Sequence, residues 1–515
     1  MTKFYITTAI DYVNSRPHVG TAYEKIVADA IARFHRQRGD DVFFAMGTDE
    51  HSQNVQREAE RRGLDPRAYC DEMAVAFEES WRVLGLSYDT FIRTTEPRHE
   101  AAVRAIFAAI HANGDIYPGL YKGLYCVSCE AFWQEKDLVD GKCPHHGTVP
   151  QSIEEKNYFF KLTRYRDPLL AHLRAHPEFV EPAARRNEIV NVLEGGLEDI
   201  SVSRASATWG IPLPIDPTQV VYVWFDALIN YLSAVGYAGE TDADRERFAR
   251  YWPADLHVVG KDITRFHCII WPAMLMSAGI ALPKSIFGHG FITVNGQKLS
   301  KSLGNVIDPS AIVERFGADA LRYFLLREIG WGGDGDFSWE QLERRYNADL
   351  ANDLGNLLSR TLSMVERYLG GDVRSMVGEG VEGGLLDLPR VAELRAAAAI
   401  AAWGRAEFDE ALKATWELVR RANQVIEERA PWNLAKDPTK KGELQQLLYE
   451  LLESLRITAL LLAPAMPSKA QTIWERIGQG GEVAGERYDA ATMSWSADTR
   501  FVGLRAGPPL FPKQA

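Results

Sequence analysis

The chain has 515 residues, of which 46% are hydrophobic and 25% are charged, as is usual for globular proteins. One hydrophobic core is too little for this length, so roughly two to four domains are expected. The formal net charge of −12 argues against wholesale wrapping of nucleic acid, although a local basic patch can still bind it. No apolar run approaches the length of a membrane span, and five cysteines are too few for a disulfide framework.

The N-terminal segment has the pattern of a βαβ unit. Residues 3–10 read as a buried strand, apolar side chains at helical spacing follow at 23–34, and residues 41–46 read as a second strand. This order predicts a parallel sheet. Strand-to-helix transitions recur at 222–234 and 256–275, so the sheet is expected to resume there. The chain enters its first strand without a basic and then apolar leader, which predicts a cytoplasmic location.

Two further regions differ from the sheet pattern. Residues of about 115–215 carry clustered cysteines and many aromatic side chains, and they read as a domain inserted into the sheet domain. From residue 346 onward the pattern is one of long amphipathic helices, typical of a helical bundle. The predicted fold is therefore α/β: a Rossmann-like, doubly wound parallel sheet with an inserted domain, followed by an α-helical bundle. The predicted domain boundaries are 1–115, 116–215, 216–290, 291–345 and 346–515.

Three of the five cysteines fall close together and predict a metal site. Cys126 and Cys129 are separated by two residues, and so are Cys143 and His146. Four such ligands at this spacing are typical of structural Zn²⁺. A redox pair explains the first two cysteines but not the second half of the pattern, and His145 competes with His146 as the fourth ligand. Because four protein ligands leave no open coordination position, the predicted zinc is structural, one per chain.

The turn after the first predicted strand has the features of a phosphate site. His18 follows the strand, and Gly20 and Thr21 open the predicted helix, whose N-terminus is a natural seat for an anion. Gly20 permits close approach of a nucleotide, His18 can donate to a phosphate oxygen, and Thr21 is a plausible N-cap. Taken alone, the stretch is also explained by an ordinary capped helix with an incidental histidine. It lacks the glycine fingerprint of dehydrogenase-type dinucleotide folds.

Residues 296–309 read GQKLSKSLGNVIDP and place two lysines, Lys298 and Lys301, among serines and glycines. An ordinary surface loop explains this segment too. Together, however, the His18-x-Gly20-x stretch and KLSKS resemble the two signatures of class I aminoacyl-tRNA synthetases. The stretches GTDEHS (47–52), GLYCVSCEAF (123–132) and NADLANDLGNLLSR (347–360) narrow the resemblance to methionyl-tRNA synthetases of bacterial type, over nearly the whole chain. The chain departs from the first signature at Thr21, where the family usually has histidine.

The resemblance implies an enzyme that activates methionine with ATP to methionyl-adenylate and transfers it to the 3′-terminal adenosine of its tRNA. It implies a split catalytic domain (1–115 and 216–290), a connective insertion with the zinc knuckle, a KLSKS and stem-contact region, and an anticodon-binding bundle. The implied catalytic residues are His18, Thr21, Lys298 and Lys301. The implied ATP-binding residues are His18, Gly20, Lys261, Asp262, Lys298 and Lys301, with Mg²⁺ accompanying ATP. The implied methionine site comprises Ile10, Tyr12, Asp49, Trp224, Leu228, Tyr231, His267 and Trp271.

The first helix of the predicted bundle carries a polar stripe. Asn352, Asn356 and Arg360 recur every four residues, and such a stripe is usually a solvated face. Amides and guanidinium groups also read the bases of unstacked RNA, and Trp432 can stack on one. The resemblance implies that Asn356, Arg360 and Trp432 read the anticodon.

The alternative to an enzyme is a non-catalytic tRNA-binding paralogue of the same fold. Intact KLSKS and GKD (260–262) segments argue against it, and Thr21 is its only support. Synthetases for leucine, isoleucine or valine carry a much larger editing insertion. The chain ends without the additional C-terminal tRNA-binding domain of dimeric relatives, so a monomer is expected.

Overall fold

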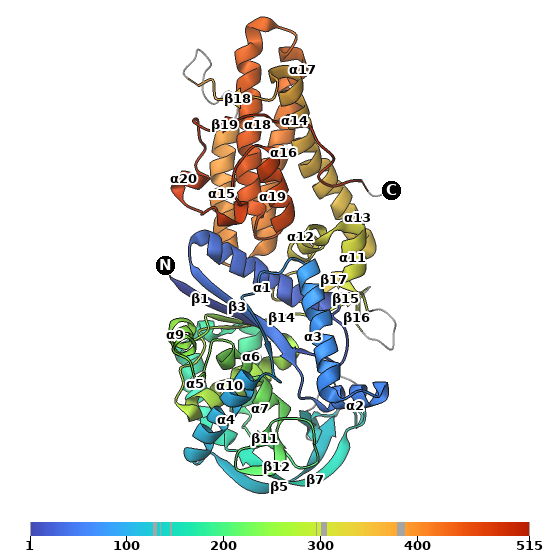
Figure 1. Ribbon diagram of the computed structural model, residues 1–515, viewed down its shortest axis with the longest axis vertical. Helices are drawn as coiled ribbons and strands as arrows, with labels where there is room; N and C mark the ends of the chain where they lie inside the picture. The colour runs from blue at the N-terminus through green and yellow to red at the C-terminus, as the bar shows by residue number, and fades with distance from the viewer. Residues whose placement is uncertain are drawn as a thin grey trace.

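The computed structural model describes residues 2–126, 131–133, 135–144, 147–294, 296–299, 306–377 and 387–513. The molecule is elongated, with a helical bundle at one end, a parallel sheet in the middle and the long strands β5 (Ile116–Cys126) and β7 (Gln151–Phe160) at the other end (Figure 1). Four predicted residues, Cys129, His145, His146 and Lys301, lie outside the described residues, as does the side chain of Lys298. Within the described ranges, no helix combines the length and apolarity that crossing a membrane requires.

A seven-stranded sheet, all of whose strand pairs are parallel, forms the centre of the molecule. Its strands run in the order β2, β3, β1, β13, β14, β8, with β4 also paired to β3. Their bounds are β1 (Lys3–Thr8), β2 (Asp11–Tyr12), β3 (Asp41–Asp49), β4 (Thr90–Arg93), β8 (Val180–Glu181), β13 (Leu256–Gly260) and β14 (Ile286–His289). The chain passes from β1 to β3 on one side, whereas β13 joins the other side of β1. The strand order therefore reverses between β1 and β13, and open α/β sheets bind ligands at the carboxyl ends of strands at such a point.

Alternate side chains of the sheet enter two separate cores, because successive residues of a strand face opposite sides. Ile6 and Val258 join the core that continues into the bundle, whereas Tyr5 and Val259 join the core on the opposite face. The helices on the first face are α1 (Val19–Arg38), α2 (Gln53–Arg62), α3 (Pro66–Val83), α11 (Pro309–Phe316), α12 (Ala318–Glu328) and α13 (Trp339–Arg345). Those on the second face are α4 (Pro97–Ala112), α5 (Arg166–Ala175), α6 (Ala183–Glu194), α7 (Val223–Ala227), α8 (Asn230–Ser233), α9 (Asp242–Tyr251) and α10 (Trp271–Ala278). The doubly wound α/β prediction is confirmed.

Antiparallel strands form within 116–160 and 200–221, whereas β8, between them in the chain, belongs to the parallel sheet. One sheet has the order β6, β5, β7, β9 and another the order β10, β12, β11. The bounds are β5 (Ile116–Cys126), β6 (Ala131–Trp133), β7 (Gln151–Phe160), β9 (Ile200–Ser201), β10 (Ser203–Arg204), β11 (Pro212–Leu213) and β12 (Asp216–Val221). The prediction that the parallel sheet resumes at 222–234 is wrong, because the strand before that helix, β12, pairs antiparallel with β10 and β11. The second predicted resumption is confirmed, since β13 pairs parallel with β1. The domain boundaries stay a prediction.

The C-terminal region is helical, as predicted. A π-helical segment, Tyr346–Gly355, continues directly into α14. The bundle helices are α14 (Asn356–Leu369), α15 (Leu388–Gly404), α16 (Phe408–Arg429), α17 (Pro431–Leu434), α18 (Lys441–Leu462), α19 (Pro467–Arg476) and α20 (Ala490–Met493). Two small sheets complete the structure: β15 (Ile292–Val294), β16 (Gln297–Lys298) and β17 (Gly335–Phe337), and β18 (Val373–Arg374) with β19 (Arg500–Phe501).

Helix α1 is joined to the bundle through a buried ion pair. Arg322 on α12 is 0% exposed and lies 2.7 Å from the carboxylate of Asp29 on α1. The same guanidinium donates to the carbonyls of Pro464 and Ala465, just after α18, at 2.9 and 2.8 Å. Burial opposes ionisation of Asp29, but Arg33 and Arg322 outweigh it and hold the pKa of Asp29 well below its ordinary value. A cation beside the carbonyls at the end of a helix is favourable. The Arg322 side chain therefore connects three elements: α12, α1 and the end of α18.

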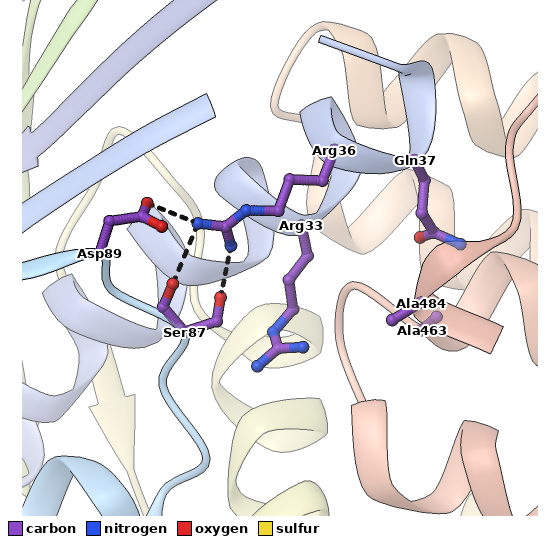
Figure 2. Close-up of a pocket in the computed structure, with 7 residues that line it drawn as sticks. All are labelled: Arg33, Arg36, Gln37, Ser87, Asp89, Ala463 and Ala484. Carbon is purple, nitrogen blue, oxygen red and sulfur yellow. Dashed lines mark hydrogen bonds and ion pairs between the residues drawn. The ribbon is translucent and has the colours of Figure 1, made fainter. Parts of the chain in front are cut away.

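A cavity of about 270 Å³ lies beside this junction. Figure 2 shows the residues that line it: Arg33, Arg36, Gln37, Ser87, Asp89, Ala463 and Ala484. Arg36 donates to the hydroxyl of Ser87 at 2.7 Å and pairs with Asp89 at 2.8 Å. Arg33 pairs with Asp29 and donates to the carbonyl of Gly85. Protein acceptors already engage both guanidinium groups, so the cavity does not offer a ready site for an anion.

Removing the Arg322 charge should lower the free energy of unfolding. In Arg322→Met, buried Asp29 loses a partner and two carbonyls lose their donor, so we expect a loss of about 3–5 kcal/mol. Chemical denaturation followed by circular dichroism measures it. Arg315→Met breaks an exposed pair with Glu343 and is the matched control, with an expected loss below about 1 kcal/mol. Equal losses in the two variants would show that the junction does not depend on the buried pair.

Candidate functional site

His18 is the N-cap of α1. Its Nδ1 accepts from the backbone N–H groups of Gly20 and Thr21 at 3.1 and 3.3 Å. In return, Thr21 Oγ1 accepts from the His18 N–H at 2.9 Å and donates to the His18 carbonyl at 2.7 Å. This reciprocal arrangement is a capping box. Because Nδ1 accepts, the neutral His18 ring carries its proton on Nε2.

The same geometry bears on the predicted catalytic role of Thr21. A hydroxyl has one proton, and that of Thr21 is donated to the carbonyl of His18. Both hydrogen bonds of the Thr21 hydroxyl therefore go to the backbone of His18 and hold that residue in position. A direct role of Thr21 toward a ligand stays a prediction.

The two predicted nucleotide signatures meet at the start of α1. A Cβ atom added to Gly20 would lie 3.1 Å from His18 Nδ1 and 3.3 Å from Leu299 Cδ1, so glycine permits this approach. The N–H of Val19 donates to the carbonyl of Ile307 at 2.9 Å. Leu299 and Ile307 flank residues 300–305, which include Lys301. The described residues on both sides of 300–305 thus contact the helix that His18 caps.

Lys261 and Asp262 lie directly after β13, on the opposite side of the point where the strand order reverses. Nζ of Lys261 is 2.7 Å from both carboxylate oxygens of Asp334 and 4.7 Å from the ring centre of Phe291. Asp334 also accepts from the Phe291 N–H at 2.8 Å. Lys261 is therefore engaged by a protein carboxylate, whereas Asp262 is exposed.

The structure brings the residues predicted to bind methionine together at the carboxyl ends of β1 and β3. Six of them belong to one apolar cluster, here called the aromatic cluster: Ile10, Tyr12, Trp224, Leu228, Tyr231 and Trp271. Trp224 stacks on Phe266 with ring centres 3.8 Å apart, and Tyr12 meets Trp224 edge-on at 6.2 Å. Asp49 is the strand partner of Tyr12 and is buried. A carboxylate therefore lies at one edge of the cluster.

His267 completes the cluster through a defined pair of hydrogen bonds. Its Nδ1 lies 3.0 Å from the carbonyl of Ile263, and its Nε2 lies 2.7 Å from the hydroxyl of Tyr231. Because a carbonyl can only accept, Nδ1 carries the ring proton and Nε2 accepts from Tyr231. Burial lowers the pKa of His267 to about 4 and raises that of Tyr231. Both groups are therefore neutral near pH 7, and the cluster presents an uncharged, aromatic wall.

Sequence reasoning missed a buried charged group beside this site. Lys25 Nζ lies 2.7 Å from Glu24 and 3.1 Å from Asp11, and Glu24 lies 2.9 Å from His289 Nε2. Burial raises the pKa of Asp11 to about 6. Burial also opposes ionisation of Glu24, but Lys25 and His289 outweigh it and lower its pKa. The available signal was the adjacency of two charges in the first half of the helix, where the neighbouring residues are mostly apolar.

A second group that was missed consists of His51, His99, Asp226 and Ser233, which are buried and hydrogen-bonded to one another. The stretch GTDEHS (47–52) and the segment 222–234 were noted, but not that His51 and Asp226 contact each other. Three of these residues stand far apart in the sequence, so no local pattern signals their contact.

In the bundle, Arg360 and Trp432 lie together although they come from different helices. They line a cavity of about 280 Å³ with Ser359, Ser363, Met364 and Tyr368. Trp432 is 38% exposed, and Arg360 pairs with Glu427 at 2.7 Å. Asn356 is exposed one turn earlier on α14. A partly exposed indole beside a guanidinium is a suitable surface for a stacked base.

Two of the four predicted zinc ligands are described, and both are buried around one residue. Sγ of Cys126 lies 3.4 Å from the hydroxyl of Thr148, and the N–H of Cys143 donates to the Thr148 carbonyl at 2.8 Å. Cys129 and His146 fall outside the described residues. Among the residues that are described, no group of three or more His, Cys, Asp and Glu side chains is arranged for a metal ion. Cys126 and Cys143 thus both contact Thr148, and the zinc site stays a prediction.

Comparison with known proteins gives a consistent result. The family model of class I tRNA synthetases (M) matches residues 4–152 and 137–362. A methionine–tRNA ligase of Caldanaerobacter subterraneus subsp. tengcongensis is 49% identical over 480 residues, which cover 92% of this chain and 74% of that protein. A methionine–tRNA ligase of Thermotoga maritima is 46% identical over 99% of this chain and 80% of that protein.

Solved structures are similar over the whole chain. Mycobacterium tuberculosis methionyl-tRNA synthetase in complex with methionyl-adenylate gives a TM-score of 0.91 at 42% identity, covering 99% of this chain and 100% of that one. The apo form of the Mycobacterium tuberculosis enzyme gives 0.83 at 40% identity, covering 100% and 99%. The arrangement described here is thus more similar to the adenylate complex than to the apo form.

Acid should destabilise the protein in part through His267. Its pKa is about 4 in the folded state against 6.5 ordinarily, so the unfolded state binds the proton more readily. The contribution of His267 to the free energy of unfolding is fully present above the pKa of the unfolded state. It is lost as the pH falls from about 6.5 to 4, and the loss reaches about 3 kcal/mol at pH 4. His267→Gln lacks this group, so the free energy of unfolding should fall less over that range. Denaturation curves at pH 7 and pH 4 for both proteins test this, and equal falls would contradict it.

Proposed function

The chain belongs to the methionyl-tRNA synthetase family of class I tRNA synthetases, and we propose that its residues join methionine to tRNA in two steps. In the first step a carboxylate oxygen of methionine attacks the α-phosphorus of ATP, the bond to the β-phosphate breaks, and pyrophosphate leaves. In the second step a hydroxyl of the 3′-terminal adenosine attacks the acyl carbon, and AMP leaves. The observation that carries the assignment is the contact of Leu299 and Ile307 with the start of α1, beside His18.

Charge stabilisation is the main task of the chain in the first step, because both reacting groups come from substrates. The N-terminus of α1 and the proton on Nε2 of His18 favour negative charge on the α-phosphate. Lys298 and Lys301 would stabilise the departing pyrophosphate. Leu299 and Ile307, on either side of residues 300–305, contact the start of α1. Lys261 would exchange Asp334 for a phosphate oxygen. ATP enters as its Mg²⁺ complex, which is part of the substrate.

Methionine recognition would rest on the aromatic cluster. Asp49 would accept from the α-amino group, and the thioether would pack against Trp224 and Tyr231, since sulfur is polarisable and favours aromatic rings. The neutral state of His267 supports this, because a charged imidazole beside a thioether would lack a partner. The remaining predicted members, Ile10, Tyr12, Leu228 and Trp271, would shape the wall.

Recognition of tRNA would use the bundle. Arg360 and Asn356 would contact anticodon bases, and Trp432 would stack on one of them. A monomer in the cytoplasm is the state we propose for the chain. The alternative, a non-catalytic tRNA-binding paralogue, has the same bundle but would not activate an amino acid.

We also propose one structural zinc per chain, held by Cys126, Cys129, Cys143 and His146. The burial of Cys126 and Cys143 around Thr148 supports it, because thiolates are preferred zinc ligands. The ion would tie the end of β5 to the turn at residue 143. It takes no part in the reaction.

Pyrophosphate exchange with each of the twenty amino acids separates the enzyme from the paralogue. Methionine alone should support strong exchange, and no exchange with any amino acid would favour the paralogue.

His18→Asn should lower the methionine-dependent rate by about 100-fold or more, because the proton of Nε2 is lost. Its amide oxygen has the reach of Nδ1 and keeps the cap, so the free energy of unfolding should change little. His18→Ala, the control, should lose the cap as well, at about 1 kcal/mol.

Arg360→Ala should separate the two steps. Adenylate formation does not involve tRNA, so methionine-dependent exchange should stay at the wild-type level. Aminoacylation should fall about tenfold or more, because about 1–3 kcal/mol of base discrimination is lost. Arg367→Ala removes an exposed arginine from the same helix and should leave both reactions unchanged. A similar loss of both reactions in Arg360→Ala would mean that the residue supports the fold only.

Purified protein should contain about one zinc per chain by elemental analysis. Cys126→Ser should lose the metal together with thermal stability, because metal-binding energy contributes to folding. Cys70→Ser, at a buried cysteine outside the cluster, should keep the metal. Native, stable protein without zinc would overturn the knuckle.

A further inference from the structure

Four polar side chains behind the aromatic cluster form a hydrogen-bonded group, here called the Asp226 network: His51, His99, Asp226 and Ser233. Asp226 lies on α7 and is 1% exposed. One of its oxygens is 2.8 Å from Nδ1 of His51, and the other is 2.7 Å from Nε2 of His99. Nδ1 of His99 lies 2.9 Å from the hydroxyl of Ser233 on α8. The proposed reaction assigns no role to any of these four residues.

The two histidines bind the same carboxylate through different ring atoms. Burial opposes ionisation of Asp226, but the two imidazoles outweigh it and lower its pKa. An ionised carboxylate can only accept, so Nδ1 of His51 and Nε2 of His99 both carry protons. Hydrogen bonds to a buried charge are about twice as strong as neutral ones and hold their partners in a narrow range of positions.

Each of three network members stands within two residues of side chains proposed to bind methionine. The pairs are His51 with Asp49, Asp226 with Trp224 and Leu228, and Ser233 with Tyr231. These partners lie at the end of β3 and, far along the chain from it, in or next to the consecutive helices α7 and α8. His99 on α4 completes the connection between α7 and α8. The network therefore links the carboxylate edge of the aromatic cluster to its aromatic wall.

The inserted region closes the network on the side of His51. Nε1 of Trp209 donates to the carbonyl of Glu50 at 2.6 Å, and its ring meets His51 edge-on at 5.4 Å. The Glu50 N–H donates to the hydroxyl of Thr94 at 2.9 Å. The backbone between Asp49 and His51 is thus held on both sides, and the bond from His51 to Asp226 ties the same segment to α7.

We propose that His51, His99, Asp226 and Ser233 are positioning residues for methionine: they fix the acceptor of its amino group, Asp49, relative to the wall that holds its side chain. The inference rests on the proposed methionine site. A displacement of about 1 Å in a binding group is enough to lose much of its effect, so bonds that remove this freedom favour methionine binding. The contacts proposed for ATP lie at the start of α1 and after β13, so its binding should not depend on the network.

Paired substitutions test the use of the two ring nitrogens. The amide nitrogen of asparagine is as many bonds from Cα as Nδ1 of histidine, and that of glutamine as many as Nε2. His51→Asn and His99→Gln therefore keep a donor to Asp226, whereas His51→Gln and His99→Asn misplace it. In methionine-dependent pyrophosphate exchange, the two misplacing variants should raise the KM for methionine about tenfold, the effect of a lost hydrogen bond to a charge. The two retaining variants should stay within about threefold, and the KM for ATP should stay at the wild-type value in all four.

The outcomes are distinguishable from those of the proposed function. A methionine KM that is the same in retaining and misplacing variants, or a KM for ATP that rises equally, would overturn the positioning role. Thermal unfolding of all variants monitors the fold. If the histidine variants do not fold, Ser233→Ala removes only a hydroxyl and decides: a raised methionine KM supports the role, and an unchanged one overturns it. Absence of exchange in the unmodified chain would instead contradict the proposed function.

Discussion

Helix α1 is buried along most of its length, so every charged side chain that it buries must find a partner. The partners lie in different parts of the molecule: Glu24 meets His289 at the end of β14, Lys25 meets Asp11 and the carbonyl of Ala9, and Asp29 meets Arg322 on α12. A buried charge without its partner costs several kcal/mol, so these pairings fix α1 relative to the sheet and the bundle together. The position of His18, at the first turn of the helix, follows from them.

One of the charges proposed to meet phosphate, that of Lys261, is paired with a protein carboxylate. Lys261 is paired with Asp334, and Asp334 keeps a second bond, from the N–H of Phe291, that does not depend on the lysine. If Lys261 moves to a phosphate as proposed, the bond from Phe291 would keep the carboxylate in place, and little of the protein would have to reorganise. Preorganised charge of this kind stabilises a transition state more than charge that must first be brought into position.

The local patterns of the sequence predicted those features that depend on neighbours along the chain. Apolar spacing located α1 and the strands on either side of it, and cysteine spacing led to Cys126 and Cys143, which both contact Thr148. The segment 222–234 was wrongly joined to the parallel sheet, because an apolar run shows that a strand is buried but not which strand it pairs with. The partners of Glu24 and Asp226 were missed for the same reason: their contacts are distant in sequence, and polar side chains read locally as solvent-exposed. The neutral state of His267 likewise follows from burial, which only the tertiary structure supplies.

The bundle is long and rigidly joined to the sheet, as contact with a long substrate at two distant places requires. Helices α16 and α18 have 22 residues each and are therefore about 33 Å long. The cavity lined by Arg360 and Trp432 lies toward the end of the bundle that is remote from α1, where α17 is labelled in Figure 1. A tRNA bound at both places spans a fixed distance only if the bundle cannot swing relative to the sheet. A flexible linker would let that distance vary, whereas the buried guanidinium of Arg322 holds the end of α18 directly against α1. Because α1 also carries His18, the same helix sets the position of the nucleotide signatures and of the bundle that would measure the tRNA.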